Sequence, residues 1–338
     1  MTIVVGLDVH REQITFDDLD LATGETTPGR IRPATREHLR AWLARYADKD
    51  VEAALEATTG WLFVVEELER VGIRAHLAEP AETRALRGRK KRAKTDRLDA
   101  RHLRQLLQER RLPESWIPPA HLVELRTRAR LRKTLVDERT AWQQRIHAQL
   151  FQQGVPRRRH LLQPQRRAEL EHLPLPAAAR QQVDTALAVI DALDEQLAPI
   201  EHDLRAFARR QAGCRALMAD YGLGELTSVS IVSELGDARR FSSSPHAVRR
   251  AGLDVTVDES AGKRAAGKLS RQGPPLLRWA LFEAAKLSAR PNSPEHAYYL
   301  QAKARLGGNR ACLAVARKLL RRAYHTLRAL GEEALQPA

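Results

Sequence analysis

The sequence predicts an α/β domain over residues 1–118, followed by all-α segments over residues 119–338. Apolar strand-like runs alternate with helix-like segments only in the first part. After Pro118 the strand patterns end, and Leu, Ala, Arg and Glu dominate at helical spacing. Pro113, Pro118 and Pro119 mark the boundary between the two parts. A chain of 338 residues is long enough for two domains or three small ones.

The first domain is predicted to have the order β-β-β-α-β-α-β-α. Thr2–Val9 is a near-continuous apolar run, as buried central strands are. Gln13–Leu21 alternates apolar and polar residues, and turn residues at Thr26–Gly29 precede a short strand at Gly29–Arg32. The other expected elements are helices at Thr35–Ala47, Trp61–Val71 and Thr95–Arg111, and strands at Val51–Ala57 and Ile73–Ala78, the last closed by Pro80.

Residues 119–210 are predicted to form a long helical arm. Two amphipathic segments are separated by a proline-rich stretch, and the second segment repeats apolar residues at heptad-like spacing. Two interpretations stay open: a plain helical hairpin, or a coiled-coil arm that dimerises or spans a nucleic acid. The heptad-like residues are Val183, Leu187, Ile190, Leu193, Leu197 and Leu204.

Residues 211–338 are predicted to form a compact helical domain. Gly222 and Gly224 join two helix-like segments, as in a helix-hairpin-helix, whose backbone N–H groups would bind a phosphate. Further helices are expected at Pro274–Lys286 and Ala311–Leu330.

The charge balance favours a polyanionic partner. Lys and Arg number 57 against 42 Asp and Glu, which gives a net charge of +15. No run of about 18 apolar residues exists, so we expect no transmembrane helix. The N-terminus is strand-like and not a signal peptide, which favours a cytoplasmic protein. Cys214 and Cys312 are too few for a disulfide framework or a zinc knuckle.

Four carboxylates are the candidate metal ligands. Asp8 lies in an apolar run, Glu56 ends another, and Asp96 and Asp99 lie three residues apart on one helix face. A carboxylate at the end of a buried strand is costly without a partner, and one divalent metal can bind several. Mg²⁺ prefers such oxygen ligands, with Mn²⁺ as the alternative, and two such ions can promote phosphoryl transfer. The competing interpretation is a helix cap at Asp96 and an ion pair between Asp99 and an arginine of the same helix.

A strongly basic run leads into the acid-bearing helix. Arg84–Arg111 holds twelve Lys and Arg against three Asp and Glu. A charge run is usually a solvated surface, but this one adjoins two candidate metal ligands. We therefore expect it to hold a phosphate backbone near the acids. The predicted nucleic-acid contacts in this run are Arg87, Arg89, Lys90, Lys91, Arg92 and Lys94.

Taken together, these features resemble the DEDD-type insertion-sequence transposases, which have a RuvC-like N-terminal domain of the RNase H fold. The resemblance covers nearly the whole chain, with its motifs in the same order. The N-terminal motifs are Gly6–His10, Leu55–Gly60 and Lys94–Arg101. The C-terminal motifs are Tyr221–Gly224, Arg240–Ser242, Arg250–Leu253, Asp258–Gly262 and Leu269–Gly273.

The resemblance implies cleavage and strand transfer of donor and target DNA. The four acids would hold Mg²⁺, and a serine, by position Ser260, would attack the scissile phosphate. Lys263 and Arg264 would offset phosphate charge beside it. The chain departs from the family pattern around this serine: it reads Glu259–Gly262 as Glu-Ser-Ala-Gly where Glu-Ser-Gly is usual, and it has Asp254-Val255 where Thr-Pro is common.

The resemblance also implies a structured noncoding guide RNA that pairs with donor and target DNA. Recombination cuts and rejoins several strands, so we expect a homo-oligomer, a dimer or tetramer, joined partly through residues 120–210. The alternatives are a junction-resolving nuclease that hydrolyses with metal-activated water, and a non-catalytic nucleic-acid-binding protein. The four acids argue against the non-catalytic protein, and the arm and Ser260 argue against the nuclease.

Overall fold

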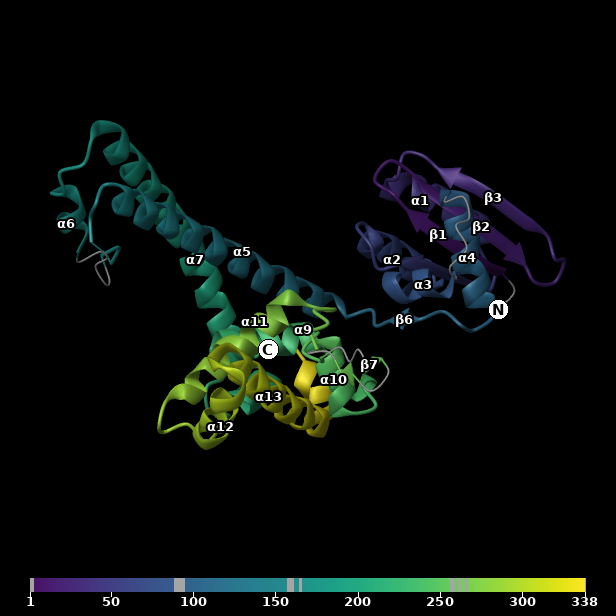
Figure 1. Cartoon of the computed structure of the whole chain (residues 1–338). Coiled ribbons are helices and arrows are strands. Elements are labelled where there is room, and N and C mark those ends of the chain that lie inside the picture. The colour runs from purple at the N-terminus through teal and green to yellow at the C-terminus, as the bar shows by residue number, and fades with distance from the viewer. Residues whose placement is uncertain are drawn as a thin grey trace. The chain divides into compact units, whose positions relative to one another are not determined.

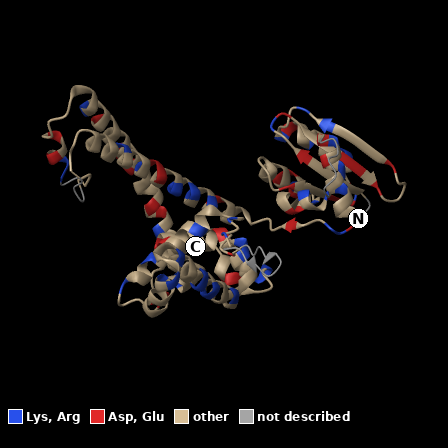
Figure 2. Ribbon diagram, viewed as in Figure 1, with Lys and Arg blue, Asp and Glu red and all other residues tan. Residues whose placement is uncertain are grey.

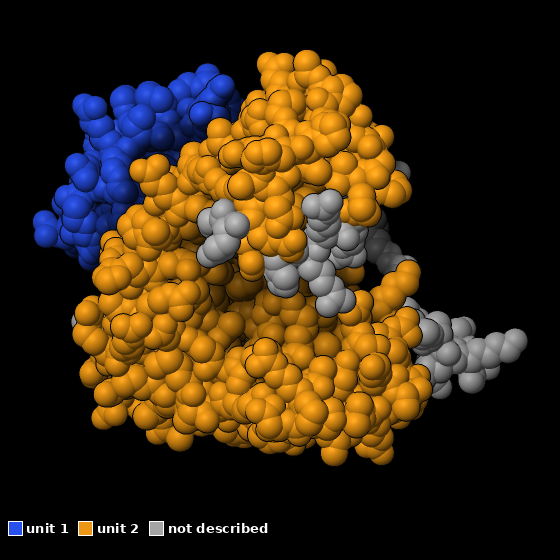
Figure 3. Space-filling model, turned by 90° about the vertical axis from the view of Figure 1, so that its left-hand side faces the viewer, with its two compact units in different colours: residues 1–117 blue, residues 118–338 orange. Residues whose placement is uncertain are grey.

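The computed structural model describes residues 3–87, 95–156, 161–163, 166–255, 259–260, 263–264 and 267–337, with only the backbone at 259–260 and 263–264. The chain divides into two compact units, residues 1–117 and residues 118–338 (Figure 3). Residue 210, the predicted end of the arm, lies inside the second unit. The division into three domains stays a prediction.

A six-stranded mixed sheet forms the centre of the first unit. Its order is β3-β2-β1-β4-β5-β6, with β1, β4 and β5 parallel and the other neighbours antiparallel. This arrangement is consistent with the RNase H-like fold that the resemblance implies. The strands are β1 (Ile3–Val9), β2 (Ile14–Asp20), β3 (Thr26–Ile31), β4 (Val51–Glu56), β5 (Arg74–Ala78) and β6 (Glu114–Ser115). The helices are α1 (Arg36–Leu43), α2 (Trp61–Arg70), α3 (Pro80–Leu86) and α4 (Asp96–Gln108), with a 3-10 turn at Ala44–Tyr46.

The two faces of this sheet pack against different helices. Odd-numbered residues of β1, such as Val5 and Leu7, join a core with residues of α1 and α2. Val4, an even-numbered residue, packs with Leu103 and Leu107 of α4. Because successive side chains of a strand point to opposite faces, the even-numbered residues of β1 face α4. Asp8 is one of them.

Helix α4 lies directly against β1 at Gly6. A Cβ at Gly6 would come within 2.0 Å of the carbonyl oxygen of Ala100 and 2.6 Å of the backbone nitrogen of Arg104. The guanidinium of Arg104 also makes a buried ion pair with Asp17 of β2. The missing side chain at Gly6 therefore lets α4 approach closely, and the ion pair fixes it to the neighbouring strand.

Two expectations for the first unit are wrong in detail. The third strand begins at Thr26, not at Gly29. Gly29 lies inside this strand and makes room for the Phe16 ring on β2, since a Cβ at Gly29 would come within 2.4 Å of that ring. Proline is tolerated at residue 28 since β3 is an edge strand. Pro80 does not merely close β5 but occupies the first turn of α3, where proline is favoured.

The second unit is helical apart from a short hairpin. Its elements are α5 (Ala120–Gln152), α6 (Arg167–Glu171), α7 (Ala177–Arg210), α8 (Ala212–Met218), α9 (Glu225–Leu235), a 3-10 turn at Ala238–Arg240, α10 (Ser244–Arg250), β7 (Glu259–Ser260), β8 (Lys263–Arg264), α11 (Pro275–Lys286), α12 (His296–Leu306) and α13 (Gly308–Leu330). Helix α12 was not expected from the sequence.

The arm is an antiparallel helical hairpin in which α5 and α7 lie side by side (Figure 1). Val183 and Ile190 of α7 pack with Ile146 and Leu150 of α5. The guanidinium of Arg139 on α5 also donates to Asp194 on α7, at 2.6 Å. Four of the heptad-like residues are buried by contacts within the chain: Val183, Ile190, Leu197 and Leu204. The structure thus shows the hairpin, and these four residues are buried by α5 and the helical body of the same chain.

Candidate active site

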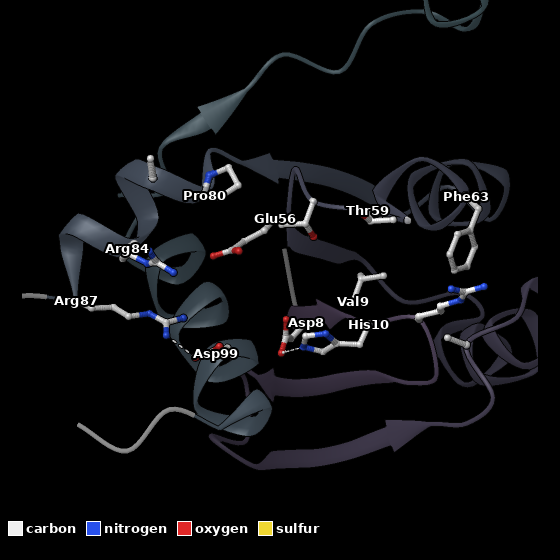
Figure 4. A pocket seen from close by; sticks show the side chains of 15 residues that line it. Asp8, Val9, His10, Glu56, Thr59, Phe63, Pro80, Arg84, Arg87 and Asp99 are labelled. Carbon is white, nitrogen blue, oxygen red and sulfur yellow. Dashed lines mark hydrogen bonds and ion pairs between the residues drawn. The ribbon is translucent and has the colours of Figure 1, made fainter. Parts of the chain in front are cut away.

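Three of the four predicted acids line one pocket of the first unit. Asp8 lies near the end of β1, Glu56 ends β4 and Asp99 is in the first turn of α4; Figure 4 shows all three around a cavity of about 920 Å³. Leu7 pairs with Leu55 in the parallel β1–β4 register, so the next residues, Asp8 and Glu56, are neighbours at the carboxyl edge. Asp99 approaches this edge because α4 packs closely on β1.

The fourth acid, Asp96, lies beside Asp8 through His10. The Nε2 atom of His10 is 3.1 Å from Asp8 Oδ2 and 3.6 Å from Asp96 Oδ1. One possible ligand atom from each of these three residues lies within 4.8 Å of the other two. The side-chain amide of Gln13 also donates to Asp96 Oδ2, at 3.0 Å. The three side chains therefore form a group that could hold a metal ion.

His10 is a site residue that sequence reasoning missed. It lies in the Gly6–His10 motif, but only Asp8 was taken from that motif as a candidate ligand. The available signal was the strand period, because residues 8 and 10 point to the same face of a strand.

The acids destabilise one another in the absence of a cation. Burial raises the pKa of Asp8, and repulsion from Asp99 and Asp96 raises it further, whereas His10 lowers it. The side chains of Asp8 and Asp99 are only 15% and 14% exposed. A divalent cation would relieve this repulsion, and carboxylate oxygens suit Mg²⁺ and Mn²⁺. The residues present thus fit the expected metal.

Two arginines bring positive charge to the same pocket. Arg84 lines it, and Arg87 lines it while donating a hydrogen bond to Asp99 (Figure 4). The metal-free interpretation expects Arg101 or Arg104 of the same helix as the partner of Asp99, but Asp99 pairs with Arg87, and Arg104 pairs with Asp17. The remaining predicted contacts in the basic run lie outside the described residues: Arg89, Lys90, Lys91, Arg92 and Lys94.

Ser260 belongs to a small hairpin in the second unit. In the antiparallel β7–β8 pair, Ser260 is opposite Lys263 and Glu259 is opposite Arg264. The chain enters and leaves this region through paired backbone, because Val255 forms a bridge with Leu269.

This paired stem is attached to the helical body. The guanidinium of Arg317 on α13 donates to the carbonyl oxygen of Leu253 at 2.6 Å. The backbone N–H of Ser270 donates to the carbonyl oxygen of Asp254 at 3.1 Å. The hairpin that carries Ser260, Lys263 and Arg264 therefore starts from a fixed stem.

Comparisons with known families assign both units. The DEDD transposase model of the IS110 type matches residues 5–154, and the model described as Transposase IS116/IS110/IS902 family matches residues 214–300. This chain belongs to the DEDD-type transposases of the IS110 family. Residues 5–154 of the transposase contain all four acids, and residues 214–300 contain Ser260.

Individual relatives agree with this assignment. The y4rJ protein of Sinorhizobium fredii, named as a transposase, is 29% identical over 94% of this chain and 90% of its own length. The transposase for insertion sequence element IS1111A of Coxiella burnetii is 30% identical over 37% of this chain and 35% of its own length. A family 20 transposase of Pseudomonas aeruginosa is 26% identical over 36% of each chain.

Of the two predicted helix-hairpin-helix glycines of the transposase, Gly222 has a packing role, whereas a Cβ at Gly224 would meet nothing within 4 Å. Gly222 has a φ of +91°, and a Cβ there would lie 3.1 Å from the carbonyl oxygen of Ala284 on α11. Gly224 precedes α9, whose first turn carries Glu225, and that carboxylate pairs with Arg209 at 2.6 Å. Phosphate binding by Gly222 and Gly224 stays a prediction. Among the described residues of the transposase, every helix is too short or too polar to span a lipid bilayer.

Proposed function

We propose that this transposase cuts and rejoins DNA by metal-dependent phosphoryl transfer, with Asp8, Glu56, Asp96 and Asp99 as the metal ligands. The observation that supports this most directly is the meeting of three carboxylates from β1, β4 and α4 in one pocket. Asp96 adds a fourth beside Asp8 and His10. Mg²⁺ is the favoured ion and Mn²⁺ the alternative; when bound, it would stabilise negative charge on the phosphate oxygens.

The arginines of the pocket are proposed to hold the substrate. Guanidinium groups bind phosphate oxygens through two parallel hydrogen bonds. Arg84 and Arg87 place two such groups on the pocket wall. Because a metal bound to Asp99 would compete with Arg87 for the charge of this carboxylate, we propose that Arg87 exchanges Asp99 for a DNA phosphate when substrate and metal enter.

The family assignment leads us to propose Ser260 as the nucleophile. Its hydroxyl oxygen would form a bond to the scissile phosphorus, and the bond from phosphorus to the leaving strand end would break. The serine loses a proton, and the leaving oxygen gains one. The hydroxyl of the strand to be joined then attacks the phosphoserine and releases the serine. One phosphate diester replaces another at each step, so the exchange needs no further energy source. Lys263 and Arg264 would offset the developing charge.

We further propose that a structured RNA guides the reaction and that the active form is a homo-oligomer. The net charge of +15 supports binding to more than one polyanion. The arm hairpin buries most of its own seam, so a dimer contact through residues 120–210 would have to use other surfaces. Light scattering with nucleic acid bound measures the oligomer. Loss of DNA target choice after RNase treatment tests the guide.

The decisive experiment for the mechanism is covalent trapping. A nicked suicide DNA substrate should leave a phosphoserine adduct on the wild-type protein and none on Ser260→Ala. Ser242→Ala is the matched control, because Ser242 is an exposed serine of the second unit outside the hairpin, and this variant should still form the adduct. If Ser260→Ala cuts and rejoins DNA normally, the nucleophile is water or another serine, and the junction-resolving nuclease becomes the better assignment.

A further inference from the structure

The pocket that holds the acids extends well beyond them. Its volume of about 920 Å³ is near the upper end of the roughly 300–1,000 Å³ that is typical of ligand pockets, so a metal ion and one phosphate would fill only a part of it. Figure 4 shows Asp8 and Glu56 between the arginines of the pocket on one side and a second group of residues on the other. This second group, which we call the aromatic end, contains Val9, Thr59 and Phe63.

The ring of Phe63 is held in place at the aromatic end. Phe63 lies in the first turn of α2 and is half-buried against the apolar core of the sheet. A Cβ at Gly60 would come within 3.5 Å of this ring and 3.3 Å of Val9, so the three residues lie together. The guanidinium of Arg36 lies over the ring at 5.9 Å from its centroid and is itself paired with Glu67, at 2.9 Å. The ring therefore has a fixed position, and part of its surface lines the pocket.

An arginine lines the same cavity. Arg11 lies in the turn between β1 and β2, directly after His10. The next residue, Glu12, accepts a hydrogen bond from the backbone N–H of Ala34 at 3.2 Å, and this bond ties the turn to the segment before α1. The side chain of Arg11 is exposed, and no carboxylate in the described part of the chain forms an ion pair with it. Its guanidinium can therefore bind an anion that enters the pocket.

An apolar ring and a guanidinium match the two parts of a nucleotide. Aromatic side chains stack on the faces of bases, and arginine binds phosphate oxygens. In a duplex, neighbouring bases cover both faces of each base. A protein ring can therefore stack on a base only where that base is unpaired and out of its stack. The aromatic end thus suits one unpaired nucleotide.

We propose that Phe63 and Arg11 hold one unpaired nucleotide of the DNA strand that is cut, next to the scissile phosphate. Phe63 stacks on the base, and Arg11 binds a phosphate of the same nucleotide. The scissile phosphate lies at the acids, and Arg84 and Arg87 hold the strand beyond it. This inference rests on the proposed function and adds the form of the substrate: the active site takes a single strand with at least one base out of its duplex.

A role in the apolar core alone is the competing explanation for Phe63. Trp61 allows the two to be separated, because it is also half-buried at the start of α2 and packs against the same core. Of these two aromatic residues, Phe63 is the one that lines the pocket. A role in the core predicts similar effects of Phe63→Leu and Trp61→Leu, whereas the proposal predicts an effect on DNA binding for Phe63→Leu alone.

The test uses the full chain and a short single-stranded DNA with a central 2-aminopurine, a base whose fluorescence falls when it stacks on another ring. Binding is measured in EDTA, so that no DNA is cut, and below the melting temperature of every variant. Phe63→Leu should bind about tenfold more weakly than the wild type, as expected for one lost base stack, and should quench the probe less. Phe63→Tyr keeps the ring and should keep the affinity and the quenching. Trp61→Leu is the matched control and should behave like the wild type.

Arg11 is tested by the salt dependence of the same binding. For a single strand, the loss of one phosphate contact in Arg11→Gln should lower the slope of log affinity against log salt by about 0.7. Arg11→Lys keeps the charge and should keep the wild-type slope. Arg30→Gln is the matched control, because this exposed arginine of β3 lies outside the pocket lining. Equal slopes for Arg11→Gln and Arg30→Gln would overturn the role of Arg11.

Three outcomes would overturn the proposal for Phe63. The first is equal affinity and quenching for Phe63→Leu and the wild type. The second is a similar loss for Phe63→Leu and Trp61→Leu, because that is the signature of a role in the core. The third is a dependence on Phe63 that is seen with RNA but not with DNA. A blunt DNA duplex should bind equally to the wild type and to Phe63→Leu, and a loss there would overturn the requirement for an unpaired base.

One further variant separates this inference from the proposed chemistry. Asp8→Asn should bind the single strand in EDTA at least as tightly as the wild type, because the change removes a negative charge from the pocket. DNA cleavage by Asp8→Asn at the wild-type rate, together with weaker strand binding by Phe63→Leu, would overturn the catalytic assignment of the pocket and support the nucleotide site alone.

Discussion

The two units of the transposase concentrate charges of opposite sign. In the first unit, the carboxylates of Asp8 and Asp99 meet at the end of a sheet, whereas in the second the charges of Arg240 and Arg250 act on one another near the end of a helix. Figure 2 shows that both units also carry acidic and basic residues elsewhere. Burial and like charges raise the pKa of Asp8 and lower that of Arg240. Such unfavourable clusters are typical of functional sites.

The difference between the units lies in how each cluster is built. Neighbouring strands bring Asp8 and Glu56 together through a fixed register, and this arrangement follows from local sequence patterns. The arginines come from residues 126, 240 and 250, and only the packing of several helices brings them together. The following changes test whether the first cluster is the chemical one and what holds it in place.

The largest effect is expected from Asp8→Asn or Asp99→Asn. Either change removes a proposed metal ligand, and loss of several kcal/mol of transition-state stabilisation would slow DNA cleavage by about 10³-fold or more. DNA affinity in EDTA should change little. Glu114→Gln is the control, because this exposed carboxylate of the first unit pairs with His76 outside the pocket. Wild-type turnover by either aspartate variant would show that the acid cluster of the first unit is not the catalytic site.

Gly6→Ala should be the next most damaging change, although it alters no charge. The added methyl group would overlap the Ala100 carbonyl, so α4 would have to move away from β1. We expect a loss of about 3 kcal/mol in the free energy of unfolding, measured with urea, and weaker Mn²⁺ binding. Gly224→Ala in the second unit is the control: a Cβ there meets nothing within 4 Å. A stable Gly6→Ala protein with normal metal affinity would show that the close helix contact does not position the acids.

Glu67→Gln tests a carboxylate of the first unit whose charged neighbours are arginines, whereas Asp8 lies near other acids. The guanidinium of Arg40, helped by Arg36 and Arg70, holds the pKa of Glu67 well below its ordinary value of 4.5. The ion pairs therefore stabilise the fold fully above this ordinary value. Their contribution is lost as the pH falls below it toward the lowered pKa of the folded state.

At pH 7 the free energy of unfolding of the Glu67→Gln variant should be about 2 kcal/mol lower than that of the wild type. At pH 3 the difference in urea unfolding should be smaller, because the unfolded wild-type chain then binds a proton at Glu67 that the folded state, with its lowered pKa, does not bind. Glu66→Gln serves as the control, since its exposed carboxylate contacts, among the described residues, just one of these three arginines, Arg36. A difference that is the same at both pH values would contradict the assigned pKa shift.

His10→Ala should have the smallest of these effects. His10 lies beside Asp8 and Asp96, and residues that ligate or orient metal ligands typically change affinity by about 10–100-fold. Mn²⁺ binding can be followed by the electron paramagnetic resonance signal of the free ion, with no DNA present. His38→Ala, an exposed histidine on α1, should bind Mn²⁺ like the wild type. If both variants bind equally, His10 takes no part in the metal site.

The sequence predicted best those site residues whose positions follow the repeat of a strand or a helix. Asp8 and Glu56 could be placed because each lies at the end of an apolar strand, and α4 could be placed because leucines recur at helical spacing. The cap of α4 is Thr95, so the alternative of a cap at Asp96 is wrong. His10 could have been found by the same strand period. Gly6 could not, because its importance is a contact with Ala100, which lies 94 positions away in the chain.

The remaining features could not be predicted, because they depend on contacts between residues that lie far apart in the sequence. The heptad-like spacing in α7 fits a partner helix equally well from the same chain or from a second one, and only the hairpin shows that α5 is a partner. The proline at residue 80 was taken as a stop, although proline also begins helices. Arg126 gave no signal at all, since its carbonyl partners lie on α9, more than 100 residues further along the chain.

The arm also sets a length scale. Helix α5 has 33 residues and therefore extends about 50 Å along its axis, at 1.5 Å per residue. B-form DNA rises 3.4 Å per base pair, so the same distance covers about 15 base pairs. Cross-hairpin ion pairs and a shared apolar core stiffen this length. The hairpin therefore keeps a nearly constant distance between its base and its tip. A duplex that contacts both ends must offer contacts separated by about one and a half helical turns.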